Sequence, residues 1–464
     1  MKKNNIPLIM LTIVLELLSI LFESTIISFI GIMFLWGIGL AYAYSDLKKR
    51  MLLFMFLLTF FTFLLSRKTV QLLFAWQDFF SYSNAVMEKS FHLIYTSLFF
   101  IIIGNYIFEI MEKRNLNIRS EKKLVKENVT LNKIQPKTIL RFSFYITIIV
   151  KMVCYLEEAL FVIKNGYLAY YKYFYSIIPS FIISFGNLST FIMWIYLFTY
   201  PNKKKTKIVL FLYCISLFLS LLSGGRGDIV VGIFTIIIYL YYRQENCKER
   251  IFTKKVKIMM AIGTFAGITF LGAYNYLRND INVDLGNQNM IKTFFYDQGS
   301  SIRVLENTII YEDELKMMNK YYALRPFLNN NVVKYVFHIP RYNNNSIDMA
   351  FNDNNLGASI TYLYDQLYYL NGGGIGTQYI AELYLEFGYL GVIIYSVILG
   401  YILGLLFNIK KEDYIMLAYS YIMIKSILFT SRNFALEYIS IFLSIPMLLF
   451  SILIKILEKK GGTR

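Results

Sequence analysis

The chain contains a series of apolar stretches of the length that crosses a lipid bilayer. Residues 51–66, 208–223 and 441–457 are examples. The hydrocarbon core of a bilayer is about 30 Å thick, and inside it the backbone has no water to bond, so only helices and closed barrels cross it. The apolar runs lack the two-residue alternation of barrel strands. The sequence therefore predicts an all-α polytopic integral membrane protein.

Composition supports this prediction, since 56% of the residues are hydrophobic and only 17% are charged. We predict one integral membrane domain over residues 1–464, with about twelve transmembrane helices and one ordered extracytoplasmic insertion, residues 278–378. The expected spans are residues 6–22, 26–44, 51–66, 91–111, 139–162, 176–199, 208–222, 228–242, 258–277, 379–408, 414–430 and 434–456.

The 47 Lys and Arg residues are distributed unevenly over the connections between these spans. Alternate connections and the two ends of the chain hold 29 of them, whereas the short connections on the other side hold 7. Basic residues concentrate in cytoplasmic loops of membrane proteins. We therefore expect both termini in the cytoplasm and the segment 278–378 on the extracytoplasmic side of the membrane.

The charge distribution also excludes several classes of function. A net charge of +17 is compatible with nucleic-acid binding, but the excess lies in short hinges, where it orients helices and meets anionic lipid. Nucleic acid is thus not the expected partner. With two histidines, three cysteines and no Cys/His cluster, we expect neither a metal site nor a cofactor.

Segment 278–378 is the one polar stretch large enough for a chemical site. It has 8 basic and 10 acidic residues, many aromatic residues, and helical patterns around 290–322 and 357–370. Its tyrosines are suited either to the membrane interface or to stacking on sugar rings.

Arginines in and near this segment are candidates for phosphate binding, because a guanidinium donates two parallel hydrogen bonds to phosphate oxygens. Arg226 lies in the tight turn Ser223-Gly-Gly-Arg-Gly-Asp228, where it either binds a ligand or reaches a lipid phosphate. The other candidates are Arg278, Arg303, Arg325 and Arg341, for which salt bridges to nearby acids are the alternative.

Glu382 and His338 are candidate general bases for an acceptor hydroxyl. Glu382 and Glu386 follow the glycine-rich loop 371–376 and share one helix face, where the helix N-terminus alone also accounts for a carboxylate. His338 is the second candidate, with a structural role as its alternative.

These features resemble one known family, the oligosaccharide repeat-unit polymerases of bacterial surface polysaccharides (O-antigen and capsular polysaccharide polymerases, Wzy type). The resemblance rests on about twelve spans, the turn 223–228, the large outer loop, and Glu382-Leu-Tyr-Leu-Glu386-Phe-Gly388-Tyr-Leu-Gly391. It covers most of the chain by topology but about thirty residues by motif.

The resemblance implies a membrane glycosyltransferase (GT-C-like) architecture and a metal-independent polymerase. Such an enzyme joins polyprenyl-diphosphate-linked oligosaccharide repeat units into capsule, O-antigen or exopolysaccharide on the outer face of the membrane. The arginines then hold the leaving diphosphate, and Glu382 or His338 is the base. A chain-length regulator and a flippase are further implied partners.

Three other functions remain open at this point. An O-antigen ligase uses the same fold with a different acceptor and often a loop histidine. A lipid-linked oligosaccharide flippase or transporter is the non-enzymatic alternative, although the chain lacks the internal repeat of such transporters. An accessory membrane subunit would need none of the arginines.

Overall fold

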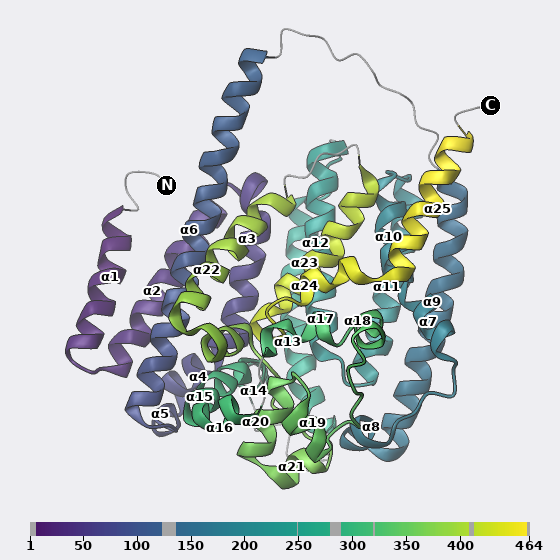
Figure 1. Cartoon of the computed structure of the whole chain (residues 1–464). Coiled ribbons are helices and arrows are strands. Elements are labelled where there is room, and N and C mark those ends of the chain that lie inside the picture. Colours follow the sequence, from purple (N-terminus) through teal and green to yellow (C-terminus); the bar gives the residue numbers. More distant parts are fainter. Residues whose placement is uncertain are drawn as a thin grey trace.

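The computed structural model describes residues 6–122, 136–247, 249–278, 289–318, 321–407 and 413–461. Within these ranges all regular secondary structure is helical, and no strand occurs (Figure 1). The prediction of an all-helical protein is confirmed.

Long helices form a bundle, and most of them coincide with the expected spans. They are α1 (Ile6–Leu21), α2 (Thr25–Tyr44), α3 (Leu47–Phe60), α4 (Ser66–Phe74), α6 (Asn84–Lys122), α7 (Lys137–Asn165), α9 (Ser180–Asn187), α10 (Ser189–Phe198), α11 (Lys203–Leu222), α12 (Arg226–Cys247), α13 (Lys254–Arg278), α22 (Tyr379–Phe407), α23 (Tyr414–Phe429) and α25 (Ile445–Gly461).

Among the described residues, 8 helices are long and apolar enough to cross a membrane, or 9 if one bent pair counts as a span. The expected spans 6–22, 139–162 and 228–242 also form helices (α1, α7 and α12) but fall outside this set. The chain is thus a multi-pass membrane protein, and the count of twelve spans stays a prediction.

Two expected spans differ in shape from a single straight helix. Span 51–66 extends to Phe74 through a π-helical turn, Phe61–Leu65, that joins α3 to α4. Span 434–456 is broken into Glu437–Leu443, which includes α24 (Glu437–Ser440), and the helix from Ile445, with a bend of 55°. Pro446 accounts for the break, because its ring disfavours helical backbone at the preceding residue and it donates no hydrogen bond.

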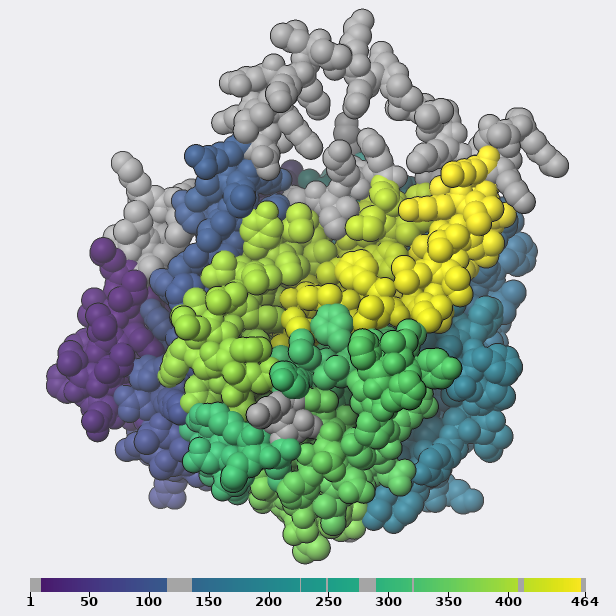
Figure 2. Space-filling model, viewed as in Figure 1, coloured from purple at the N-terminus to yellow at the C-terminus, as the bar shows by residue number. Residues whose placement is uncertain are grey.

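Short helices gather at one end of the bundle, below the long helices in Figures 1 and 2. They are α5 (Trp76–Phe79), α8 (Tyr167–Tyr173), α14 (Met290–Gln298), α15 (Ile302–Ile310), α16 (Glu312–Met318), α17 (Arg325–Leu328), α18 (Asn331–Val336), α19 (Ile347–Asn352), α20 (Leu356–Tyr364) and α21 (Gln366–Leu370). Helix α1 begins and α25 ends at the opposite end (Figure 1). This arrangement separates the polar insertion from both ends of the chain.

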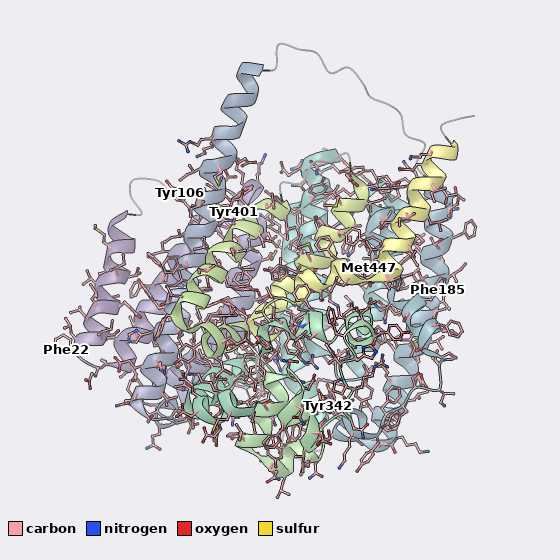
Figure 3. All side chains as sticks on the ribbon, viewed as in Figure 1. Phe22, Tyr106, Phe185, Tyr342, Tyr401 and Met447 are labelled. Carbon is pink, nitrogen blue, oxygen red and sulfur yellow. The ribbon has the colours of Figure 1, made fainter. Side chains whose placement is uncertain are left out.

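The outer surface of the bundle carries large apolar side chains. Phe22 and Phe185 point outward at opposite edges, with 70% and 44% of their surface exposed (Figure 3). Helix α13 has few buried residues, and Ile262 and Phe265 on it are exposed. Such a surface is stable when lipid covers it.

A close backbone contact in the interior joins α6 to α22. A Cβ atom on Gly400 would lie 2.0 Å from the carbonyl oxygen of Ile101, and one on Gly104 would lie 2.1 Å from that of Val397. Ser97 and Ser396 hydrogen-bond beside this contact at 2.8 Å. Small residues let the backbones of membrane helices approach closely, and this contact fixes the position of α22 against α6.

Replacing Gly400 by Val should therefore separate α6 from α22 and destabilise the protein by about 1–3 kcal/mol, the usual cost of overpacking. The measurement is the thermal unfolding midpoint of the purified protein in detergent. Gly37→Val is the control, because no atom lies within 4 Å of the added Cβ position. Equal midpoints for the two variants would contradict the close contact.

Candidate active site

Two cavities open at the end of the bundle where the short helices gather. We call the first the arginine cavity and the second the tyrosine cavity. The arginine cavity is lined by Arg67, Lys68, Gln71, Asp78, Ser81, Tyr82, Tyr296, Arg303, Glu306 and Tyr364. The tyrosine cavity is lined by Tyr167, Leu168, Tyr171, Asn344, Asn345, Met349, Asn355, Gly357, Ala358, Tyr368, Tyr369, residues 372–377, Arg432, Asn433 and Phe434. Their volumes are about 410 and 460 Å³.

The arginine cavity forms where α4 follows the π-helical turn. π-Helical turns are rare in proteins. Those that do occur are frequently found at functional sites, since they displace the residues that follow. Ser66, the first residue of α4, donates a hydrogen bond to the carbonyl of Phe295 (2.7 Å), which ties the turn to α14. Arg67 and Lys68 then face α15, which contributes Arg303 and Glu306.

Three cationic side chains line this cavity, those of Arg67, Lys68 and Arg303. Lys68 is 1% exposed; its Nζ lies 2.9 Å from Glu306 Oε1 and donates to the carbonyl of Phe79 at 3.1 Å. Arg67 donates to the hydroxyl of Tyr296 at 2.8 Å. The Arg67 guanidinium also packs on the ring of Tyr296, with Cζ 3.9 Å from the ring centre. Guanidinium groups bind phosphate oxygens through paired N–H donors, so the cavity is suited to a phosphate group.

The surroundings of Arg303 keep it charged. Burial alone would lower its pKa, but hydrogen bonding to Tyr82 and the nearby Tyr364 raise it. Burial raises the pKa of Glu306, although Lys68, Arg67 and Arg303 act in the opposite direction. The balance of charge in the cavity is therefore positive, with Asp78 as the other acid in its lining.

The tyrosine cavity has an aromatic and amide lining. Tyr167 and Tyr171 come from α8, and Tyr368 and Tyr369 from α21. Flat aromatic faces with adjacent amides and hydroxyls are suited to a ligand that is both ring-shaped and rich in hydroxyl groups. Among the described residues, the charged one in this lining is Arg432, whose Nη1 donates to Gln298 Oε1 at 3.0 Å.

Glu382 lies directly behind the wall of the tyrosine cavity. It is 0% exposed, and its carboxylate accepts hydrogen bonds from Thr377 Oγ1 (2.6 Å) and from the backbone amide of Ala435 (2.9 Å). Thr377 itself lines the cavity. One carboxylate thus joins the glycine-rich loop, α22 and the segment that carries Arg432 and Phe434.

Helix α20 connects the two cavities. Gly357 and Ala358 near its start line the tyrosine cavity, and Tyr364 at its end lines the arginine cavity. At 1.5 Å per residue, Ala358 and Tyr364 are about 9 Å apart along the helix. Gln298, the partner of Arg432, precedes Gly299, which packs against the backbone of Arg67. The two cavities are therefore neighbours.

The turn 223–228 lies next to the tyrosine cavity. A Cβ on Gly224 would lie 2.1 Å from the ring of Tyr167, and one on Gly227 would lie 2.4 Å from Phe429. Asp228 forms an ion pair with Lys425 of α23 at 2.7 Å. Arg226 is the first residue of α12, and its side chain lies outside the described part of the structure.

The other candidate arginines occupy separate places. Arg325 stacks on Phe434 with Cζ 4.6 Å from the ring centre and pairs with Asp353 at 3.4 Å, so it supports a wall residue of the tyrosine cavity. Arg341 is exposed and donates to Asn331 at 3.3 Å. The side chain of Arg278 lies outside the described residues. Of the arginines predicted from the sequence whose side chains are described, only Arg303 lines a cavity, so Arg303, Arg325 and Arg341 do not share one.

The two candidate bases differ in their surroundings. His338 is exposed, has a φ of 53° in a turn, and lines neither cavity. Glu386, one turn after Glu382, accepts a hydrogen bond from the backbone amide of Ala323 at 2.9 Å, which is a structural role. Glu382 stays the candidate with a connection to a cavity.

Sequence reasoning missed Arg67, Lys68 and Arg432. Each follows directly on a long apolar stretch, at the end of the bundle where basic residues are few. The scarcity of basic residues at this end could have identified them, because a Lys or Arg where few others occur indicates a functional role.

Among the described residues, no group of three or more His, Cys, Asp or Glu side chains is placed to hold a metal ion.

Comparison with known proteins gave one result. Neither the curated proteins nor the solved structures contain a match. The family model described as "O-antigen polysaccharide polymerase Wzy" matches residues 5–460, which is nearly the whole chain. That family acts on lipid-linked oligosaccharide repeat units in the bacterial inner membrane. The chain therefore belongs to the O-antigen polysaccharide polymerase Wzy family, the enzymes that polymerise lipid-linked O-antigen repeat units.

Proposed function

We propose that this polymerase works in the two neighbouring cavities, on the extracytoplasmic side of a membrane domain with about twelve spans, a GT-C-like architecture and cytoplasmic termini. The acceptor hydroxyl attacks the anomeric carbon of the donor glycan, the bond from that carbon to the diphosphate breaks, and polyprenyl diphosphate leaves. The observation that carries the proposal is the pairing of a cationic cavity with an aromatic, amide-lined one, joined by α20, whose Ala358 and Tyr364 line one cavity each and are about 9 Å apart along the helix.

The arginine cavity is proposed to hold the diphosphate of the donor. Arg67 and Arg303 present planar donors, and Lys68 adds a buried positive charge. Charge that develops on the leaving diphosphate is stabilised by donors that are already in place. Arg226, in the turn whose Gly224 packs against Tyr167, is proposed to hold the diphosphate of the second lipid-linked substrate.

The tyrosine cavity is proposed to hold the acceptor glycan. The stacking alternative for its tyrosines is favoured by Tyr167, Tyr171, Tyr368 and Tyr369, which line one cavity together with four asparagines. We propose that Glu382 accepts the proton of the acceptor hydroxyl through Thr377, whose hydroxyl donates to the carboxylate and lines the cavity.

The family match favours polymerisation over the ligase alternative. His338, which kept that alternative open, is exposed and lines neither cavity. Metal independence is likewise proposed, since the arginines and Lys68 supply the positive charge that a metal ion would otherwise bring. A chain-length regulator and a flippase are the proposed partners in the membrane.

Arg303→Lys and Arg226→Lys should each reduce chain extension by about 10- to 100-fold. Each change removes a bidentate charged hydrogen bond, which is worth about 1.5–3 kcal/mol. The measurement is the size of the surface glycan on a gel from a deletion strain that carries the variant.

The expected glycan is a single capped repeat unit. Arg341→Lys is the matched control, because Arg341 lines neither cavity, and it should retain long chains. Full-length glycan from Arg303→Lys would contradict the role of the arginine cavity.

Glu382→Gln should lower the elongation rate by about 10²- to 10⁴-fold, the usual contribution of a general base. Gln can still accept from the amide of Ala435, so the fold should persist. In the proposed proton transfer through Thr377, the Thr377→Ser variant keeps a hydroxyl and should stay active. The Thr377→Val variant lacks the hydroxyl and should be inactive. If Thr377→Val elongates normally while Glu382→Gln is inactive, Glu382 acts by another route.

Elongation by purified protein in vesicles should persist after EDTA treatment, because no step of the proposed mechanism uses a metal ion. Loss of activity in EDTA that Mg²⁺ restores would contradict metal independence.

A further inference from the structure

A third cavity lies between the N-terminus of α7 and the junction of α10 with α11. Its volume is about 170 Å³, and it is lined by Lys137, Thr138, Arg141, Tyr196, Tyr200, Pro201, Asn202 and Lys205. Helices α7 and α11 both begin here and lead away to the candidate active site: α7 ends just before Tyr167, and α11 ends at the turn 223–228. The cavity therefore lies at the far end of these two helices.

Every charged residue in this lining is basic. Lys137, Arg141 and Lys205 form no ion pair within the described part of the chain. Two helix N-termini add the partial positive charge of their first-turn amides. Tyr196 is 2% exposed, and its hydroxyl has no hydrogen-bond partner among the described residues. The cavity thus offers several donors and no anionic partner for them.

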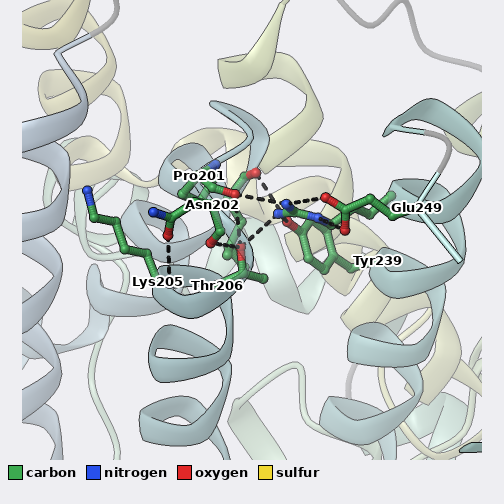
Figure 4. A network of polar contacts seen from close by, with 8 residues as sticks. Pro201, Asn202, Lys205, Thr206, Tyr239 and Glu249 are labelled. Atoms are coloured by element: carbon green, nitrogen blue, oxygen red, sulfur yellow. Dashed lines mark hydrogen bonds and ion pairs between the residues drawn. The ribbon is translucent and has the colours of Figure 1, made fainter. Parts of the chain in front are cut away.

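The turn that forms one wall is held rigidly. Asn202 caps α11 by accepting a hydrogen bond from the amide of Lys205 at 3.0 Å. Arg243, which is 3% exposed, donates to the carbonyl of Pro201 (2.8 Å) and to Thr206 Oγ1 (2.7 Å), as Figure 4 shows. Its own charge is balanced by Glu249 at 3.0 Å. The cavity is therefore preformed, and Arg243 is not available to a ligand.

Apolar surface continues from the cavity along both helices. Ile139, Phe142, Ile146 and Ile149 on α7 are exposed, as are Ile208 and Phe211 on α11. A ligand with an anionic head and hydrocarbon chains would bury both kinds of surface, which free phosphate cannot do. Basic pockets between transmembrane helices are known to hold anionic lipid head groups.

We propose that this cavity binds the phosphate of an anionic glycerophospholipid, with the acyl chains lying along the exposed faces of α7 and α11. The bound lipid ties together the starts of two helices that position Tyr167 and the turn 223–228 at their other ends. The proposal does not depend on the mechanism given above, because it concerns the opposite end of the bundle.

The test is lipid retention by the purified full-length protein, measured by native mass spectrometry with phosphatidylglycerol and with phosphatidylcholine. The site variant is Lys137→Gln, Arg141→Gln and Lys205→Gln combined. The matched control, Lys203→Gln, Lys204→Gln and Lys207→Gln combined, removes the same charge from exposed positions on α11 that do not line the cavity.

We expect the site variant to bind phosphatidylglycerol at least about tenfold more weakly than the control variant, since each cation near lipid phosphate contributes about 1 kcal/mol. Equal weakening in both variants would overturn the proposal in favour of diffuse attraction. So would equal binding of phosphatidylcholine, or displacement of the lipid by inorganic phosphate, which indicates a free-anion site. If the combined variant does not fold, Arg141→Gln alone, compared with Lys204→Gln, gives the same decision.

Discussion

A backbone group inside a bilayer has to find its hydrogen-bond partner within the protein, and this requirement determines where the chain can depart from a helix. The break between α23 and α24 shows how it is met. The amide of Ala435 donates to Glu382, and the carbonyl of Ala435 accepts from Tyr395. Both side chains come from α22, whose position is set by its close contact with α6. A buried carboxylate thus makes an irregular segment stable next to the hydrocarbon.

The cavities follow from these departures. The arginine cavity borders the π-helical turn 61–65, and the tyrosine cavity borders the break after α23 and the glycine-rich loop. Polar pairs also occur between continuous helices, such as Ser97 with Ser396 and Asp228 with Lys425. Both cavities of the candidate active site, however, lie beside a departure from regular helix, and the charged groups that line them already have partners within the protein.

Much of the fold was predictable from the sequence, because lipid imposes a simple rule on long apolar runs. The helices occur where the hydrophobic stretches predicted them, apart from the bend before Pro446 and the extension of span 51–66 to Phe74. The site was less predictable. Arg303 was a candidate, yet its neighbours Arg67 and Lys68 lie more than 200 residues away in sequence, and only tertiary packing joins them. Arg325 and Arg341 have the same residue type but contact a ring and an amide instead.

Whether the two cavities open outside the cytoplasmic membrane is tested most directly by cysteine labelling in spheroplasts. Cys154, Cys214 and Cys247 are first replaced by serine, and a single cysteine is then placed at Tyr335, which is 84% exposed in the insertion, or at Lys204 at the other end of the bundle. A membrane-impermeant maleimide should label Tyr335→Cys in intact spheroplasts and Lys204→Cys only after permeabilisation. The reverse pattern would place the cavities in the cytoplasm, where the proposed transfer between exported lipid-linked glycans could not occur.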